Sequence, residues 1–245
     1  MITQISYFRG MIVSLTIVRY RKVFIPFAFV AMAIHHLPML FQKHCSFYKL
    51  LGTGGNGAIS IKPVLQQWAI LACWDNREDF ELFYAHSFIS KWWAFFKVEK
   101  WTMLCTPLQS HGKWDGKEPF ADEPIKDYNG PIVILTRAKI RFSRMKTFWK
   151  SVKAVAASLE IAPGRIFDIA IGETYQLAAT FSVWDNVSNM KAYAYAPGKH
   201  ADVIKRARDE DWLAEELFAR FKPIAAMGTL NNADPLKGLI KFDEL

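Results

Sequence analysis

Apolar and polar residues alternate along residues 132–142, which is the pattern of a strand with two different faces. A stretch with helical spacing follows, and Pro163-Gly164 supplies the signal that ends it. Continued along this part of the chain, the pattern predicts strand 132–142, helix 145–159, strands 165–171 and 176–184, helix 186–195, and a helix that passes into a strand within 199–221.

The first part of the chain has the same order of elements. Its pattern predicts strand 11–20, helix 23–36, strand 68–74, helix 77–96 and strand 101–106. The glycine-rich segment 52–57 obscures the remaining strand, and we expect a flexible loop there, over a cavity. The segment lacks the Lys-Ser/Thr of a phosphate-binding loop and does not fit Gly-x-Gly-x-x-Gly, so a phosphate site is disfavoured.

Two similar segments, AILACWDN at 69–76 and ATFSVWDN at 179–186, indicate an internal repeat. VSLT at 13–16 matches VILT at 133–136 upstream, and a further match lies downstream in the same order. We conclude that the chain is a tandem duplication of βαββαβ units with the order of a ferredoxin-like fold. The expected fold class is α+β, with the two sheets paired into a dimeric-α+β-barrel-type domain. We expect the helices outside and a cavity between the sheets.

The duplication sets the expected domain boundaries. They are 1–110 for the first unit with its Gly-rich loop, 111–131 for a linker, 132–230 for the second unit with a candidate ligand residue, and 231–245 for a C-terminal tail. The linker is rich in Gly, Pro and charged residues, as expected of a connection between units.

Strand alternation places Arg137 on the face expected between the sheets, where the first copy has Ile17. A buried guanidinium is costly unless it meets an anion or hydrogen-bond acceptors. Three alternatives stay open. Arg137 pairs with a carboxylate such as Asp168, lies exposed at the mouth of the barrel, or contacts a bound ligand or oxidant.

His200 begins a helical run after Pro197-Gly198 and shares one apolar stripe with Val203, Ile204 and Ala207. A lone histidine on such a stripe is more often a core residue than a ligand. No Cys, His or carboxylate lies three or four residues away, which disfavours zinc. Haem iron needs only one protein ligand, so that role stays open. Weaker candidates are His35, His36, His44, His86 and His111.

Composition narrows the class of partner. With 51% hydrophobic residues the chain can form a sizeable core, and its formal charge of +8 suits an anionic membrane surface or a carboxylate-bearing ligand. Nucleic acid is disfavoured because no run of Lys and Arg exceeds two residues. Acidic residues near Asp209 and Glu215 predict a solvated helix face.

The three cysteines form no disulfide framework and no Cys-x-x-Cys, so we expect a cytoplasmic protein.

An apolar stretch from Val23 to Phe41 follows Arg21 and Lys22 near the N-terminus. Two histidines and Pro38 interrupt it, and it is shorter than the roughly 20 clean apolar residues of a spanning helix. The pattern therefore favours a buried or membrane-touching helix over a signal peptide or a transmembrane anchor.

Several longer segments are distinctive. They are KLLGTGG at 49–55, WAILACW at 68–74, GKWDGKEPF at 112–120, LTRA at 135–138, IAIGE at 169–173, PGKH at 197–200 and EELFARF at 215–221. In this order, within Val13 to Phe221, they resemble the spheroidene monooxygenase family. GKWDGKEPF is long and unusual, so shared local propensity does not account for it.

The resemblance implies a haem-dependent monooxygenase, an oxidoreductase that binds haem b. It would use O₂ and an electron donor to insert oxygen into a carotenoid or another apolar substrate. It also implies kinship with dimeric α+β barrel haem proteins, in which the residue matching His200 is the iron ligand. Arg137 then becomes a candidate catalytic and cofactor-binding residue, on the distal side of the haem or at its propionates.

The chain departs from the family pattern in region 1–48, which is more apolar, and in residues 58–66. The resemblance therefore supports the prediction of the cofactor more strongly than the prediction of the substrate. Alternatives are a haem-dependent lyase or dehydratase and a non-catalytic protein that binds haem or an apolar ligand. A homo-oligomer and peripheral membrane contact also stay open. Candidates for an aromatic substrate channel are Trp68, Trp92, Trp93, Trp114 and Phe120.

Overall fold

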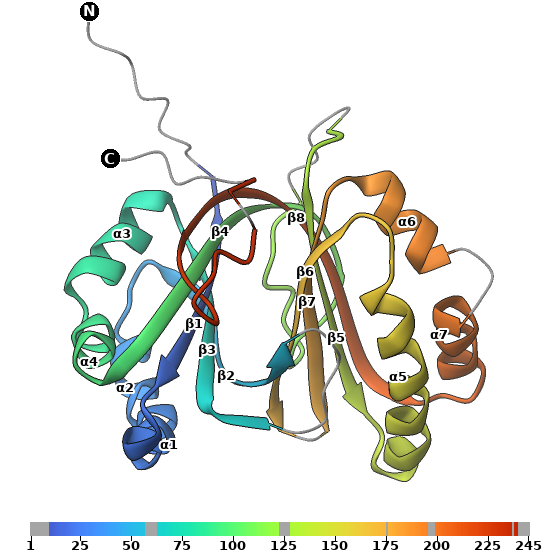
Figure 1. The fold of residues 1–245 in the computed structure, drawn as a ribbon, viewed down its shortest axis with the longest axis horizontal. Coiled ribbons are helices and arrows are strands. Elements are labelled where there is room, and N and C mark those ends of the chain that lie inside the picture. Colours follow the sequence, from blue (N-terminus) through green and yellow to red (C-terminus); the bar gives the residue numbers. More distant parts are fainter. Residues whose placement is uncertain are drawn as a thin grey trace, which may run out of the picture.

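A computed structural model describes residues 10–56, 63–122, 128–174, 176–195, 199–236 and 238–239. Within these residues, eight antiparallel strands close into one barrel in the order β1-β3-β2-β6-β7-β5-β8-β4. The helices lie outside the barrel, in one group for each half of the chain (Figure 1). The predicted α+β fold with two βαββαβ units is confirmed.

The two halves repeat the same order of elements. The first consists of β1 (Ile12–Tyr20), η1 (Lys22–Phe24), α1 (Ile25–Ile34), α2 (His36–Leu40), β2 (Cys45–Asn56), β3 (Pro63–Trp74), α3 (Arg77–His86), α4 (Phe88–Phe96) and β4 (Lys97–Gly112). The second consists of β5 (Ile132–Ile140), η2 (Phe142–Arg144), α5 (Met145–Glu160), β6 (Arg165–Thr174), β7 (Leu177–Trp184), α6 (Val187–Tyr195), α7 (Lys199–Asp209) and β8 (Leu213–Gly228).

Two strand pairs join the halves, β2 with β6 and β4 with β8. The first pair uses the glycine-rich segment, since Gly52 lies opposite Gly172. The prediction of a flexible loop is therefore wrong for residues 52–56, which belong to β2, whereas Gly57 lies outside the described residues. Glycines weaken an isolated strand, but here β6 supplies the pairing partner. A Cβ on Gly172 would lie only 2.7 Å from the carbonyl oxygen of Leu177.

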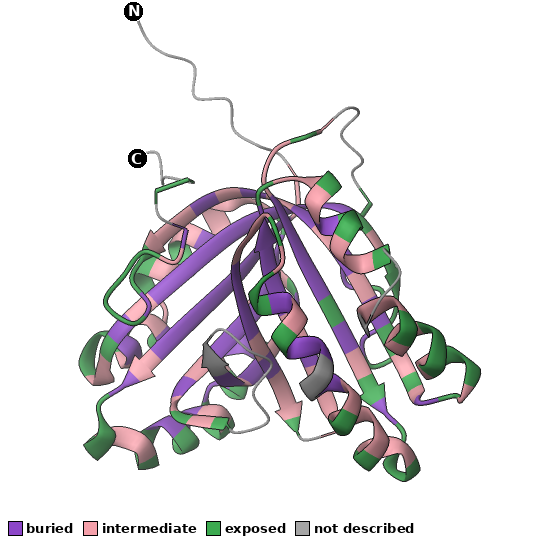
Figure 2. Cartoon of the chain, turned by 45° about the vertical axis from the view of Figure 1, so that its right-hand side comes forward, coloured by how far each residue is buried: buried purple, intermediate pink, exposed green. Residues whose placement is uncertain are grey.

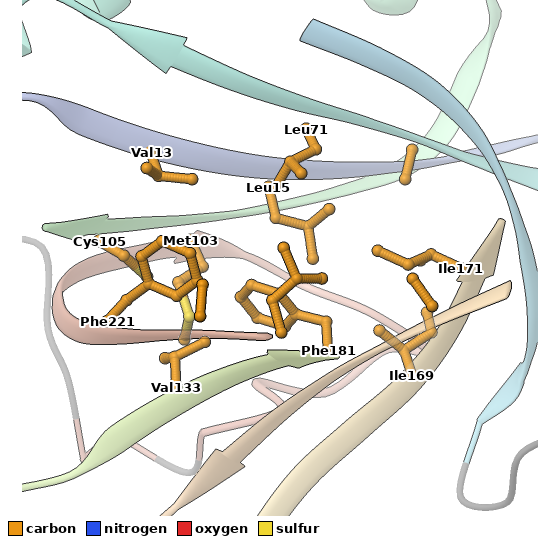
Figure 3. Close-up of a cluster of buried hydrophobic side chains, with 14 of the residues drawn as sticks. Val13, Leu15, Leu71, Met103, Cys105, Val133, Ile169, Ile171, Phe181 and Phe221 are labelled. Carbon is orange, nitrogen blue, oxygen red and sulfur yellow. The ribbon is translucent and has the colours of Figure 1, made fainter. Parts of the chain in front are cut away.

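The barrel interior is filled by apolar side chains. Inward-facing residues of all eight strands meet there, as the close-up in Figure 3 shows for most of them. Labelled members are Val13, Leu15, Leu71, Met103, Cys105, Val133, Ile169, Ile171, Phe181 and Phe221. The predicted phase of the strands is confirmed, because Val133 and Leu135 face inward while Ile132 and Ile134 pack under helices. Among the described residues, the prediction of a cavity between the sheets is wrong, because these buried side chains pack together in that space.

The repeated Trp-Asp-Asn segment has a local role in each half. Trp74 and Trp184 end β3 and β7 and are buried in the layer between sheet and helices. Asn76 and Asn186 accept a hydrogen bond from the backbone amide three residues further on, at 2.9 and 2.8 Å. An asparagine in this place caps a helix N-terminus. The segment therefore sets where each strand ends and the next helix begins.

The apolar stretch near the N-terminus forms η1, α1 and α2 rather than one helix. Within the described residues, Lys22–Leu40 is the one helical stretch long and apolar enough to cross a membrane, and 22% of its most apolar window is buried. α1 packs on the sheet through Ala28 and Ala31, while most of its larger side chains are exposed. The strands are mostly buried and the helices carry most of the exposed surface (Figure 2).

Candidate functional site

A cavity of about 620 Å³ lies outside the barrel, between the sheet of the second half and its helices. Its walls come from β5, β6 and β7 on one side and from α5, α6 and α7 on the other. Phe29 and Met32 of α1 and Trp68 of β3 extend the wall into the first half. Its volume lies within the range of roughly 300–1,000 Å³ that is typical of small-molecule and cofactor sites.

Differences in side-chain size between the two copies account for this cavity. Counted from the tryptophans that end β3 and β7, the outward pair Val18–Trp68 corresponds to the pair Ala138–Ala178. By the same count, the pair Leu50–Ile70 of the first half corresponds to the pair Ala170–Thr180 of the second. In the first half the larger residues help to fill the layer between sheet and helices. In the second half the smaller ones line the cavity.

His200 of α7 lines this cavity and is partly buried. Its Nδ1 lies 3.3 Å from the carbonyl oxygen of Ala194, and its ring packs beside Tyr193 with the centroids 4.9 Å apart. Because a carbonyl oxygen only accepts hydrogen bonds, this contact assigns the proton to Nδ1 and leaves Nε2 a lone pair. Burial lowers the pKa of His200, although the hydrogen bond to Ala194 acts in the opposite direction. The lowered pKa favours the neutral ring, which is the form that binds a metal ion.

These features fit the haem that the family resemblance implies. Much of the cavity wall is aliphatic or aromatic, including Phe148, Val152 and Ile204. His200 offers one neutral nitrogen while a backbone carbonyl holds the other, which is the usual way in which proteins orient a metal-binding histidine. Arg208 also lines the cavity and is exposed, so it can meet a propionate at the rim.

Arg137 lies on the opposite face of β5, inside the barrel and away from the cavity. Its side chain is 1% exposed, and its guanidinium binds Glu215 and, at 3.2 Å, Asp115. Asp168, the carboxylate considered from the sequence, binds Arg165 instead. The geometry therefore favours an ion-paired Arg137, with different carboxylates from the one considered, over contact with a ligand in the cavity.

Glu215 is the member of this network that the sequence pattern missed. It lies in β8, so the expected solvated helix face is wrong at this position. Burial raises the pKa of Glu215, but hydrogen bonds from the backbone amides of Gly116 and Asp115, together with Arg137, lower it overall. Those amides lie 2.8 and 2.9 Å from its carboxylate oxygens. Glu215 thus joins β5 to the segment that follows β4.

The GKWDGKEPF segment at 112–120 folds back against the barrel. Asp115 and Gly116 both have positive φ, 52° and 75°, which defines a type I′ turn. On either side of this turn, Trp114 and Phe120 are buried in the interior cluster. Part of the expected linker 111–131 therefore belongs to the hydrophobic core of the barrel.

The remaining candidates are scattered over the molecule. Trp68 lines the cavity, but Trp92 and Trp93 pack in the helix layer of the first half. Trp114 and Phe120 face the barrel interior, so these five aromatic residues do not form one channel. Among the described residues, the cavity wall does not include His35, His36, His44, His86 or His111.

Comparison by sequence finds three similar curated proteins, each named spheroidene monooxygenase. The one from Cereibacter sphaeroides is 34% identical over 209 residues, which is 84% of this chain and 64% of that protein. The one from Rhodobacter capsulatus is 32% identical over 86% of this chain and 89% of that protein. The one from Rubrivivax gelatinosus is 31% identical over 78% of this chain and 73% of that protein. No family model matches the chain.

Comparison by structure finds crystal structures of aldoxime dehydratase. One, in complex with butyraldoxime, has a TM-score of 0.59 at 8% identity and covers 87% of this chain and 79% of that one. Another has a TM-score of 0.56 at 10% identity and covers 87% of this chain and 81% of that one. At this identity the likeness shows a shared barrel fold.

Replacing Arg137 by Met should lower the free energy of unfolding by about 2–3 kcal/mol, because Glu215 and Asp115 lose their buried cation. Urea denaturation measures this change. Haemin titration should show unaltered uptake, because Arg137 lies on the far face of β5. Arg141→Met breaks an exposed pair with Asp211 and should cost less than about 1 kcal/mol. If a folded Arg137→Met chain failed to bind haemin, the ligand-contact alternative would be correct.

The double substitution Ala170→Leu and Thr180→Ile gives the cavity wall the residues that the first half has at these positions. It should abolish or strongly weaken haemin uptake by filling the cavity. It should also raise the free energy of unfolding of the ligand-free chain by about 1–2 kcal/mol through added apolar burial. Absorbance titration and urea denaturation test the two effects. Ala157→Leu, on the exposed face of α5, is the control for an added Leu. Unchanged uptake in the double variant would place the ligand elsewhere.

Proposed function

Because the chain belongs to the spheroidene monooxygenase family, we propose that it is a haem-dependent monooxygenase that oxidises an apolar, carotenoid-like substrate. The observation that carries the proposal is the cavity of about 620 Å³ beside His200, which occurs in the second copy where small residues replace large ones. The names of the curated relatives support the substrate class.

In this proposal His200 would hold the iron through Nε2. Its hydrogen bond to Ala194 keeps the ring in one tautomer and limits its rotation. Arg208, which lines the exposed edge of the cavity, would pair with a propionate there. A haem held there would supply the activation of O₂ that a monooxygenase requires.

The cavity walls would position the substrate and exclude water. The outward alanines and threonines of β5, β6 and β7 leave space over the sheet, and α5 supplies Phe148, Val152 and Leu159 opposite them. These surfaces give few hydrogen-bonding partners, so they suit a hydrocarbon chain better than a polar molecule. One oxygen atom of O₂ would enter the substrate, and two electrons from a donor together with two protons would reduce the other to water.

The variant His200→Ala should lose haem while keeping its fold. The haem content of purified protein, read from the Soret band, should fall about tenfold or more because the iron loses its protein ligand. Circular dichroism should match the unsubstituted chain, and added imidazole should restore part of the band. His36→Ala, at an exposed histidine of the first half, is the matched control. An unchanged Soret band in His200→Ala would show that His200 is not the iron ligand.

Isotope labelling tests the reaction itself. With ¹⁸O₂, a reductant and a carotenoid, the product should gain one ¹⁸O atom, and labelled water should contribute none at early times. Product that forms without O₂ and without reductant would indicate a lyase or dehydratase instead. Retention of haem and carotenoid without any product would indicate a binding protein.

A further inference from the structure

Exposed apolar side chains gather on the helices of the first half. Of the 17 large hydrophobic residues that are exposed in the described part of the chain, 13 precede residue 100 and four follow it. We give the name α1–α2–α4 face to the group that lies on η1, α1, α2 and α4 and at the end of α2. Its most prominent residues are Val23, Phe27, Leu37, Leu40, Phe41 and Phe95. α1 and α4 lie side by side, since the rings of Phe27 and Phe96 stack with centroids 4.9 Å apart.

The second half supplies an internal comparison for this face. α5 holds there the place that α1 holds in the first half, and its exposed residues include Lys146, Lys150 and Glu160. α1 reads IPFAFVAMAI, without a charged residue, and only Ala28 and Ala31 are buried. A helix that is apolar all round belongs in an apolar environment. The fold itself does not supply that environment to α1.

Charge indicates what covers the α1–α2–α4 face. Residues 1–74 contain no Asp or Glu and seven basic residues, namely Arg9, Arg19, Arg21, Lys22, Lys43, Lys49 and Lys62. Arg21 and Lys22 precede the apolar stretch, Lys43 follows it, and all three are exposed. An apolar surface with a basic rim matches a membrane with anionic headgroups. A second copy of the chain would bring like charges together at that rim.

The geometry requires the helices to lie on a membrane rather than cross it. By length and composition the whole Lys22–Leu40 stretch could cross a membrane, but it is divided into η1, α1 and α2, and α1 alone has 10 residues, about 15 Å at 1.5 Å per residue. The stretch also begins after β1 and ends before β2, and both strands belong to the same barrel.

We propose that the α1–α2–α4 face docks on a lipid bilayer that carries anionic headgroups. Phe29 and Leu65 are both exposed and line the cavity beside His200, so the cavity reaches the surface next to this face. Entry of an apolar substrate from the bilayer into the cavity rests on the proposed function. Docking does not, because it needs neither substrate nor haem.

Vesicle flotation tests the docking with the full chain and no substrate. The chain should float with vesicles of phosphatidylcholine and phosphatidylserine and bind vesicles of phosphatidylcholine alone much more weakly. Leu37→Ser, Leu40→Ser and Phe41→Ser together should reduce binding about tenfold or more, because three exposed side chains no longer enter the interface. Arg21→Gln, Lys22→Gln and Lys43→Gln together should do the same for anionic vesicles only.

Matched controls come from the second half. Phe142→Ser, Ile161→Ser and Tyr195→Ser remove side chains that are 85%, 82% and 62% exposed, and they should leave flotation unchanged. Circular dichroism verifies that each variant is folded. The proposal is overturned if the unsubstituted chain fails to float, or if both apolar triple variants lose binding equally. It is also overturned if the chain is a dimer that ignores vesicles and dissociates on the Leu37, Leu40 and Phe41 substitutions. An inactive or haem-free chain that still floats would count only against the proposed function.

Discussion

Closure of the barrel is the constraint on which the other features depend. Once β2 pairs with β6 and β4 with β8, every strand residue is committed either to the interior or to the layer under the helices. Arg137 and the cavity wall at Thr136 and Ala138 are therefore neighbours in sequence but lie on opposite sides of β5. A packed interior gives the scaffold its rigidity, and the layer outside it is free to diverge.

Duplication made that divergence tolerable. Both halves keep the buried tryptophan and the capping asparagine at the same places, so strand ends and helix starts are fixed twice. The outward strand residues differ in size between the halves, and the barrel is closed with both sets. Large residues such as Trp68 and Ile70 help to fill the first half, whereas Ala178 and Thr180 open the second. The two halves thus share the order of their strands and helices, but the cavity that could hold a ligand belongs mainly to the second half.

Local patterns in the sequence are enough to predict the features that depend on local spacing. The alternation in β5 predicted both of its faces, and the stripe around His200 predicted a helix face that now lines the cavity. Local patterns do not predict the conformation of the glycine segment of β2 or of Glu215 in β8, because that conformation depends on distant partner strands. The cavity was expected inside the barrel. Its true position follows from comparing side-chain sizes between aligned copies, a signal that the repeat already contained.

The proposed function and the proposed docking together give the uneven surface of the two halves a physical reason. A hydrocarbon substrate is concentrated in membranes and scarce in water, so an opening that faced bulk water would seldom meet it. Here the cavity belongs to the second half, yet Phe29 and Trp68 of the first half complete its wall. The first half therefore provides the apolar margin of a cavity whose walls come mainly from the second half. Large exposed apolar patches mark interaction sites, and the exposed residues of α1 fit that role if α1 forms the border between a bilayer and the cavity.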